Sequence, residues 1–178
     1  MKSFKRLSFT AIFLLLSHSA FAENDPRTYT EIGYTLINYK ELGYTATPTA
    51  IRGIIGYEIS PNLAVEAMLG IGAADSNLTI QGVNVVFSVG TMAGVYLKPK
   101  ISLSEDFEIF GRFGYAKSGA QASVVGYSFT SSGNDLSYGG GAKFRLTKNT
   151  DAVVDFMSFY DKNSATATGV TFGLGFKF

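Results

Sequence analysis

The sequence contains no cysteine and no tryptophan, only four prolines and a single histidine, His18. His18 lies within the first 22 residues, which have the pattern of an export signal, so the exported chain would carry neither a thiol nor an imidazole. Their absence excludes disulfides, zinc and haem sites of the usual kind, and cysteine or histidine nucleophiles. We therefore expect no metal, no cofactor and no enzymatic activity.

The export signal is recognised from its three parts. Three basic residues stand among the first six, an apolar run covers Leu7–Leu16, and Ala20 and Ala22 form an A-x-A-like cleavage site. The apolar run is shorter than the roughly 20 residues that a membrane-spanning helix needs. We predict cleavage after Ala22 and one domain over residues 23–178. Without the three basic residues, acids slightly outnumber bases, so we expect no nucleic-acid partner.

From Arg27 onward, apolar side chains alternate with small or polar ones at a period of two, which is typical of strands with two different faces. The content of 20 glycines, 15 phenylalanines and 10 tyrosines also favours strands over helices. Eight alternating segments can be followed, at about residues 31–36, 51–59, 63–72, 87–98, 107–119, 135–146, 152–160 and 169–178.

The connections between these segments differ in length. Short polar connections occupy residues 60–62, 102–106, 148–150 and 163–166, and longer ones occupy residues 40–48, 76–86 and 120–134. The two kinds alternate along the chain, except that residues 163–166 are short at the end where the others are long. Short turns at one end and longer loops at the other are typical of outer-membrane barrels, whose turns face the periplasm. The sequence predicts an all-β fold, an eight-stranded antiparallel up-and-down transmembrane β-barrel.

The two faces of the segments distinguish a membrane barrel from a soluble lipocalin-like cup. One face carries nearly all the charges: Glu31, Arg52, Glu58, Glu66, Lys98, Glu108, Arg112, Lys143, Arg145, Asp155 and Lys177. The other face is crowded with large apolar residues, which fit lipid better than the narrow lumen of eight strands. Its aromatic residues predict two outward girdles, with Phe87, Tyr115, Tyr138 and Tyr160 near the loops and Tyr57, Phe107, Phe144, Phe176 and Phe178 near the turns.

The closing residues GVTFGLGFKF resemble the terminal strand of outer-membrane β-barrel proteins, and LSYGGGAKFRLTKNTDAVVDFMSFY resembles the small eight-stranded barrels. These include the transmembrane domain of OmpA, the OmpX/Ail group and the neisserial opacity barrels. The resemblance implies a Gram-negative outer-membrane protein. It also implies that the terminal strand is the signal read by the outer-membrane insertion machinery, carried by Val170, Phe172, Leu174, Phe176 and Phe178. Enzymes among such barrels use a histidine beside a serine, which the exported chain lacks.

The inward face brings ionisable residues from six strands into one narrow lumen: Glu31, Arg52, Glu66, Arg112, Lys143 and Asp155. Three acids and three bases predict an ion-pair network, because buried charges are tolerated when they are paired. The alternative is an ion path, which would make the protein a narrow porin-like channel for ions or very small solutes.

Apolar residues also occur in two of the long loops: Val83, Val85, Val124, Val125, Tyr127 and Phe129. They either continue the strands above the membrane or form exposed tips that contact a host protein, another surface protein or a lipid. We expect a monomer in the lipid bilayer of the outer membrane. Its predicted role is structural or surface-interacting, as an adhesin or an immune-evasion protein, with a lumen plugged by the charged network.

Overall fold

The computed structural model describes residues 27–80, 82–124, 127–162 and 164–178. The predicted signal segment, including Ala20 and Ala22, lies outside the described residues, and so does Val125. Within the described part of the chain, no helix is long and apolar enough to cross a membrane. The strands are β1 (Thr28–Glu41), β2 (Tyr44–Ala46), β3 (Thr49–Ser60), β4 (Leu63–Ala74), β5 (Ser76–Ile80), β6 (Val83–Ser102), β7 (Phe107–Val124), β8 (Tyr127–Arg145), β9 (Thr150–Lys162) and β10 (Ala165–Lys177).

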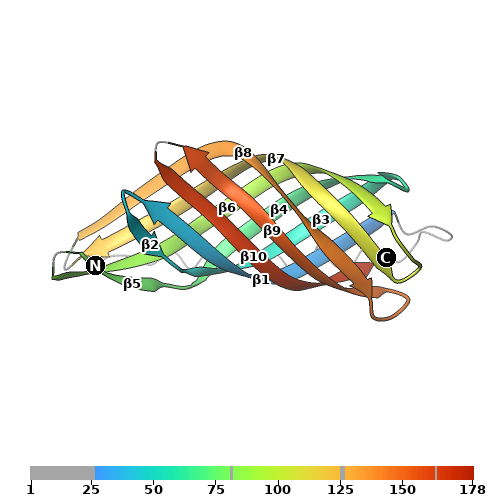
Figure 1. Ribbon diagram of the computed structural model, residues 1–178, viewed down its shortest axis with the longest axis horizontal. Helices are drawn as coiled ribbons and strands as arrows, with labels where there is room; N and C mark the ends of the chain where they lie inside the picture. The colour runs from blue at the N-terminus through green and yellow to red at the C-terminus, as the bar shows by residue number, and fades with distance from the viewer. Residues whose placement is uncertain (1–26, 81, 125–126, 163) are drawn as a thin grey trace, which may run out of the picture.

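Eight of these strands form a closed antiparallel ring (Figure 1). Sequence neighbours pair along the order β1-β3-β4-β6-β7-β8-β9-β10, and β10 returns to pair with β1 along its whole length. The short strands β2 and β5 pair with β1 and β6 and extend the outer end of the barrel. This arrangement confirms the predicted eight-stranded up-and-down barrel.

The barrel turns its apolar face outward and its charged face inward. On β1, Ile32 is 55% exposed on the outside, whereas its neighbour Glu31 is 5% exposed inside. On β7, Phe113 and Arg112 divide in the same way. A soluble cup would show the opposite arrangement, so the outward apolar face agrees with a barrel embedded in lipid.

The outward apolar face ends at a similar level on neighbouring strands, and we call this band the apolar belt. On β1 the outward residue after Leu36 is Asn38, and on β7 Lys117 follows Tyr115. On β8 the outward residues beyond Leu136 are all polar: Asn134, Ser132, Thr130 and Ser128. Strands β6, β7 and β8 have 20, 18 and 19 residues, against about 9 to 11 for a membrane crossing, so they continue well beyond the belt.

The described parts of the long connections are therefore paired strands. β1 and β2 are joined by Leu42 and Gly43, whose φ angles of 48° and 85° fit a two-residue turn with both central residues in the left-handed region. β7 and β8 remain paired as far as Val124 and Tyr127. The apolar loop residues that the structure describes thus continue the strands above the belt: Val83, Val85, Val124, Tyr127 and Phe129.

Two β-bulges reverse the faces of the outer strand ends. The β6–β7 register shifts between Val89 and Met92, and the β9–β10 register shifts between Ala167 and Thr168. The ring of Phe87 consequently stacks inside the barrel on Tyr39, with centroids 4.5 Å apart. Tyr160 also lines the interior. The prediction that Phe87 and Tyr160 belong to the outward girdle is wrong, because an inserted residue changes the parity on which it depended. Tyr115 and Tyr138 do face outward.

Candidate functional site

The centre of the lumen is organised around Arg112, which β7 places inside the barrel. Its guanidinium donates from Nε to Glu66 Oε2 at 2.6 Å, from Nη1 to Asp155 Oδ2 at 2.5 Å and from Nη2 to Glu31 Oε2. These three carboxylates come from β4, β9 and β1, and all are buried. The planar fork of arginine suits such multiple contacts, so Arg112 ties together strands on different sides of the barrel.

Arg52 and Lys98 complete this group. Arg52 donates from both terminal nitrogens to Asp155, with Nη1 3.1 Å from Oδ1. Lys98 Nζ lies 3.1 Å from Glu31 Oε1 and 3.2 Å from Glu66 Oε1. We call the resulting set of three acids and three bases the central tier: Glu31, Arg52, Glu66, Lys98, Arg112 and Asp155.

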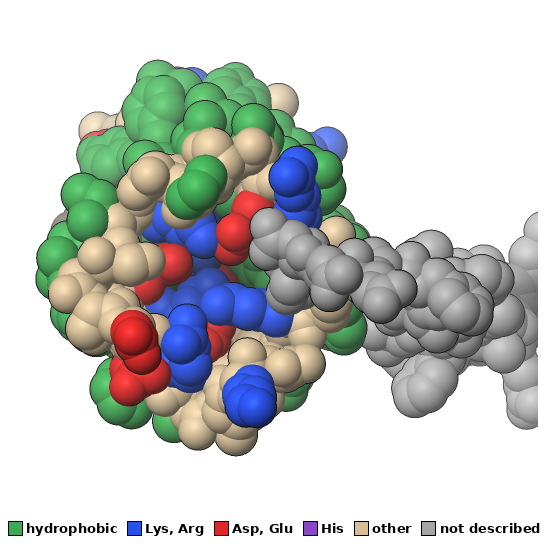
Figure 2. Space-filling view, turned by 90° about the vertical axis from the view of Figure 1, so that its right-hand side faces the viewer, with side chains coloured by type: hydrophobic (Ala, Val, Ile, Leu, Met, Phe, Trp, Pro, Cys, Tyr) green, Lys and Arg blue, Asp and Glu red, His purple; other side chains and the backbone are tan. Residues whose placement is uncertain are grey.

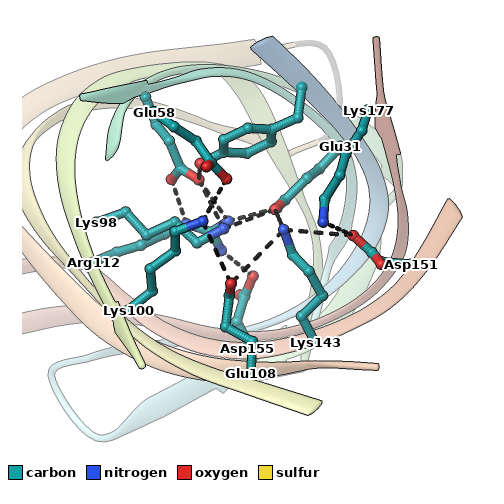
Figure 3. A network of polar contacts seen from close by, with 12 residues as sticks. Glu31, Glu58, Lys98, Lys100, Glu108, Arg112, Lys143, Asp151, Asp155 and Lys177 are labelled. Carbon is teal, nitrogen blue, oxygen red and sulfur yellow. Dashed lines mark hydrogen bonds and ion pairs between the residues drawn. The ribbon is translucent and has the colours of Figure 1, made fainter. Parts of the chain in front are cut away.

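A second balanced set, the inner tier, lies toward the short turns: Glu58, Lys100, Glu108, Lys143, Asp151 and Lys177. Lys143 joins the two tiers, since its Nζ lies 3.7 Å from Glu31 and 3.8 Å from Asp151. Figure 2 looks into the end at which the C-terminus lies and shows acidic and basic side chains gathered in its hollow. Figure 3 shows labelled members of both tiers converging in the lumen, among them Arg112, Lys98 and Lys143.

Apart from the close Lys100–Glu58 pair, the ion pairs of the inner tier are longer than those of the central tier, at 3.5 to 3.9 Å. Glu108 Oε1 and Asp151 Oδ2 are buried without a hydrogen-bond partner among the described residues, and Lys143 lies 3.9 Å and 3.8 Å from them. Distances of this size leave room for bridging water. The inner tier is thus the less completely hydrogen-bonded end of the network.

Two aromatic rings line the network and contact its cations. Lys98 Nζ lies 4.3 Å from the centre of the Phe110 ring, and the Arg112 guanidinium carbon lies 4.5 Å from it. Tyr29 donates its phenol hydrogen to Glu66 Oε1 at 2.6 Å, and its ring lies 4.8 Å from the ammonium groups of Lys98 and Lys143. These cation–π contacts add stabilisation to the ion pairs.

An apolar layer covers the central tier on its outer side. On each strand, the inward residue two positions nearer the outer end is apolar or aromatic. Met68 lies above Glu66 on β4, Met157 above Asp155 on β9, and Tyr96 above Lys98 on β6. Ile37, Met92 and Phe159 belong to the same buried cluster. Tyr96 donates to Ser137 Oγ at 3.0 Å, which fixes its ring across the lumen.

Beyond this layer the barrel opens into a cavity of about 230 Å³, which we call the outer cavity. It is lined by Ile37, Tyr39, Glu41, Phe87, Val89, Met92, Ser118, Gly119, Ala120, Ser131, Ser132, Gly133, Phe159, Tyr160, Ala165 and Ala167. Tyr39 donates to Glu41 Oε2 at 2.7 Å. Burial and the adjacent carboxylate raise the pKa of Tyr39 above its usual range, so its phenol keeps its proton.

A charged pair ties β8 to β9 just above the apolar belt. The Asp135 carboxylate accepts hydrogen bonds from Lys162 Nζ at 2.8 Å and from the backbone N–H of Asp161 at 2.8 Å. The hydrogen bond from Lys162 and the backbone donors hold the pKa of Asp135 below its ordinary value. The β8–β9 ladder ends at Tyr138 and Ser158, so this carboxylate continues the connection between the strands.

All six lumen residues predicted from the sequence contact one another directly or through Arg112. The structure adds several that the prediction omitted: Tyr29, Glu58, Lys98, Lys100, Glu108, Asp151 and Lys177. Lys98, Glu58, Glu108 and Lys177 were already assigned to the charged face. Lys100 could have been found by extending the alternation past Pro99, since Lys98 and Lys100 share its parity.

The remaining predicted positions lie on the outside and at the outer end. Phe172, Leu174 and Phe178 are exposed on the outer face of the barrel or just beyond β10, in alternation with the buried Gly169, Thr171 and Gly175. Val83, Tyr127 and Phe129 are exposed at the hairpin tips, whereas Val85 and Val124 are half-buried within them. No group of three or more metal-ligating side chains is arranged around a common point in the described ranges.

Comparisons with known proteins agree with this geometry. The family model of the outer membrane protein beta-barrel domain matches residues 8–178. Among solved structures, Ail, the attachment invasion locus protein of Yersinia pestis, superposes with a TM-score of 0.63 at 20% identity, over 85% of this chain and 97% of that one. Neisserial surface protein A gives 0.69 at 12% identity, over 85% and 97%. The N-terminal β-barrel domain of Pseudomonas aeruginosa OprF gives 0.58 at 12% identity, over 83% and 97%. No curated protein sequence matches the chain.

Proposed function

Because this chain belongs to the outer-membrane protein β-barrel family and lies in the outer membrane, we propose that it is a surface-interaction protein with a closed lumen. In this proposal the barrel is a rigid support, and its outer hairpins carry the specific function as an adhesin or an immune-evasion protein. The observation that carries the proposal is the contact of Arg112 with Glu31, Glu66 and Asp155 from three different strands.

The closed lumen is supported by the balance of its charges. The central tier pairs three acids with three bases within 3.2 Å, so an entering ion would have to displace an existing partner. Breaking a buried pair costs several kcal/mol, about 3 to 5 in measured cases. The apolar layer of Met68, Met157 and Phe159 adds a second barrier that offers an ion no polar ligand.

The outer hairpins are supported as the interaction surface by their extent and exposure. Strands β6, β7 and β8 continue beyond the apolar belt, and Tyr127 and Phe129 at the tip are 72% and 68% exposed. Exposed aromatic residues on a paired strand are well suited to binding a partner, because little conformational entropy is lost. Ail has been solved in complex with the heparin analogue sucrose octasulfate, and a surface partner for this chain would be in keeping with that.

The interaction role is tested by shortening both hairpins. A variant in which residues 76–86 and 120–134 are replaced by two-residue turns keeps the barrel below them. Cells of a non-adherent bacterium that display this variant should lose retention on host-cell and matrix surfaces, relative to cells that display the intact protein. Equal retention at equal surface abundance would contradict the assignment to the hairpins.

The alternative function is a narrow channel for ions or very small solutes, favoured by the Glu108 and Asp151 oxygens of the inner tier that lack a hydrogen-bond partner among the described residues. Recordings on refolded protein in planar bilayers separate the two. A closed lumen predicts no reproducible unitary conductance. A conductance that changes in Arg52→Ala or Glu66→Ala would establish the channel and overturn the closed lumen.

The chain is exported by its signal, cleaved after Ala22, and recognised by the outer-membrane insertion machinery through Val170, Phe172, Leu174, Phe176 and Phe178. It acts as a monomer without a cofactor and catalyses no reaction. Mass spectrometry of the protein extracted from membranes tests the cleavage, since a mature chain starting at Glu23 is expected.

A further inference from the structure

We propose that the outer cavity binds a small organic cation with an apolar body, such as an aryl- or alkylammonium ion. This site lies in the outer end of the barrel interior, above the central tier and below the hairpin tips. On three strands its lining residues lie nearer the outer end of the barrel than the apolar belt does. These residues are Tyr39 on β1, Ser118 on β7 and Gly133 on β8. A ligand would therefore enter from the external medium rather than from the lipid.

The walls of the cavity are aromatic. Tyr39 of β1 and Phe87 of β6 stack at 4.5 Å with 25° between their planes, and these strands are not neighbours in the barrel, so the stack crosses the lumen. Phe159 and Tyr160 contribute two further rings from β9. Rings present a negative face to a cation, and such surfaces recognise ammonium ions with apolar substituents.

The charge of the cavity is negative. Glu41 is the one ionisable acid among the lining residues, and the lining includes no lysine or arginine. Tyr39 holds the carboxylate in place through the bond to Oε2. A carboxylate beside aromatic rings favours a cation and repels an anion.

An unused polar group is also present in the wall. Ser118 Oγ is buried, and no hydrogen-bond partner for it exists among the described residues. A buried hydroxyl without a partner calls for an explanation, and a bound molecule or water is the usual one. The floor beside it, formed by Met92, Ile37 and Phe159, is apolar. The cavity thus combines one carboxylate, one free hydroxyl and an apolar floor.

The size of the cavity limits the ligand. About 230 Å³ is smaller than the roughly 300 to 1,000 Å³ of sites that bind drug-sized molecules. One ring with a compact ammonium group is an appropriate probe. Benzyltrimethylammonium has one ring and a compact ammonium group. Benzyl alcohol and phenylacetate are its neutral and anionic counterparts.

The test is a titration of the refolded protein in a maltoside detergent, whose headgroup is uncharged. Because the chain has no tryptophan, tyrosine fluorescence reports binding, and calorimetry provides a second measurement. Benzyltrimethylammonium should bind about ten-fold more tightly than benzyl alcohol, and phenylacetate should bind most weakly. Glu41→Gln should remove this preference. Glu105→Gln, on a turn at the opposite end of the barrel, also removes one negative charge and should leave the preference for the cation unchanged.

A variant that fills the cavity tests whether the ligand binds there. Ala167→Phe should abolish binding of benzyltrimethylammonium, and Ala120→Phe serves the same purpose if the first variant does not fold. Folding is checked by the heat-dependent shift in gel migration that β-barrels show. The proposal is overturned if folded wild-type protein binds no benzyltrimethylammonium at millimolar concentration. Equal binding of benzyl alcohol, or an unchanged preference in Glu41→Gln, would also overturn it.

Discussion

Tyr29 and Gly56 are register partners on β1 and β3, and the Tyr29 ring occupies the space that a side chain at position 56 would need. This close approach lets the phenol reach Glu66 and places the ring beside Lys98 and Lys143. A glycine on the inner face is therefore part of the charged network, although it carries no polar side chain.

Replacing Gly56 with valine should displace Tyr29 and destabilise the barrel by about 1 to 3 kcal/mol, through overpacking and the loss of the hydrogen bond to Glu66. Urea unfolding in lipid vesicles measures the change. Gly53→Ala is the control on the same strand, because the nearest atom to its new Cβ is 4.0 Å away. Equal stability of the two variants would show that Tyr29 has another low-energy position.

Arg112→Met should be the most damaging single change in the lumen, with a loss of about 3 to 5 kcal/mol, because three buried carboxylates lose their shared partner. The same unfolding experiment applies. Arg145→Met is the matched control, since the Arg145–Asp106 pair is 3.9 Å apart with side chains 42% and 62% exposed. An exposed pair of this kind contributes at most about 1 kcal/mol. A small effect of Arg112→Met would mean that Arg52 and Lys98 compensate for it.

The Asp135 contacts predict a pH dependence at the outer end of the barrel. Because the pKa of Asp135 is lowered in the folded protein, its stabilising contribution is present above the ordinary pKa and is lost as the pH falls through the folded value. In that acidic range the amide of Asp161 should lose protection from exchange, measured against its intrinsic exchange rate at the same pH. NMR titration of the Asp135 carboxyl carbon gives the pKa directly. Lys162→Met should raise it, whereas Lys148→Met, at the other end, should not.

The outward terminal strand predicts an assembly defect. Removing Phe178 should lower the amount of folded protein in the outer membrane, and the truncated chain should accumulate in the periplasm if this strand is the insertion signal. Membrane fractionation with heat-modifiable gel migration measures both pools. Phe129→Ala removes an aromatic side chain from a hairpin tip and should assemble normally. Normal assembly without Phe178 would move the signal elsewhere in the strand.

Alternation in the sequence was sufficient for the barrel and for the inward position of Glu31, Arg52, Glu66, Arg112, Lys143 and Asp155. Alternation is sufficient because successive side chains of a strand point to opposite faces. A charged residue and its apolar neighbours in the sequence therefore lie on opposite sides of the barrel wall. The partners of each charge could not be predicted in this way. Which carboxylates reach Arg112 depends on the stagger of strands around the barrel, and the sequence pattern does not contain it.

The outer cavity was not predictable for a different reason. Phe87 and Tyr160 keep the outward parity in the sequence, but the bulges near Val89 and Ala167 turn them inward. Gly90 lies in the β6 bulge, opposite Gly119, but glycines occur throughout these strands and do not single out this position. The β9 irregularity falls at Phe159, where no glycine marks it. The cavity could not be predicted from the sequence, because two of its aromatic lining residues, Phe87 and Tyr160, face inward only as a result of these bulges.

The pairing of β1 with β10 also has a kinetic consequence. The hydroxyl oxygens of Thr35 and Thr171 lie 2.9 Å apart across the β1–β10 pairing, which we call the seam, although 136 positions separate the two residues along the chain. Every other strand pair of the ring joins sequence neighbours and can form as a local hairpin, so the seam carries the largest loop-closure cost and should form last. Until then the nascent sheet has two unsatisfied edges open to pairing with other chains. The period before closure is therefore when this protein is most exposed to aggregation and most in need of a chaperone.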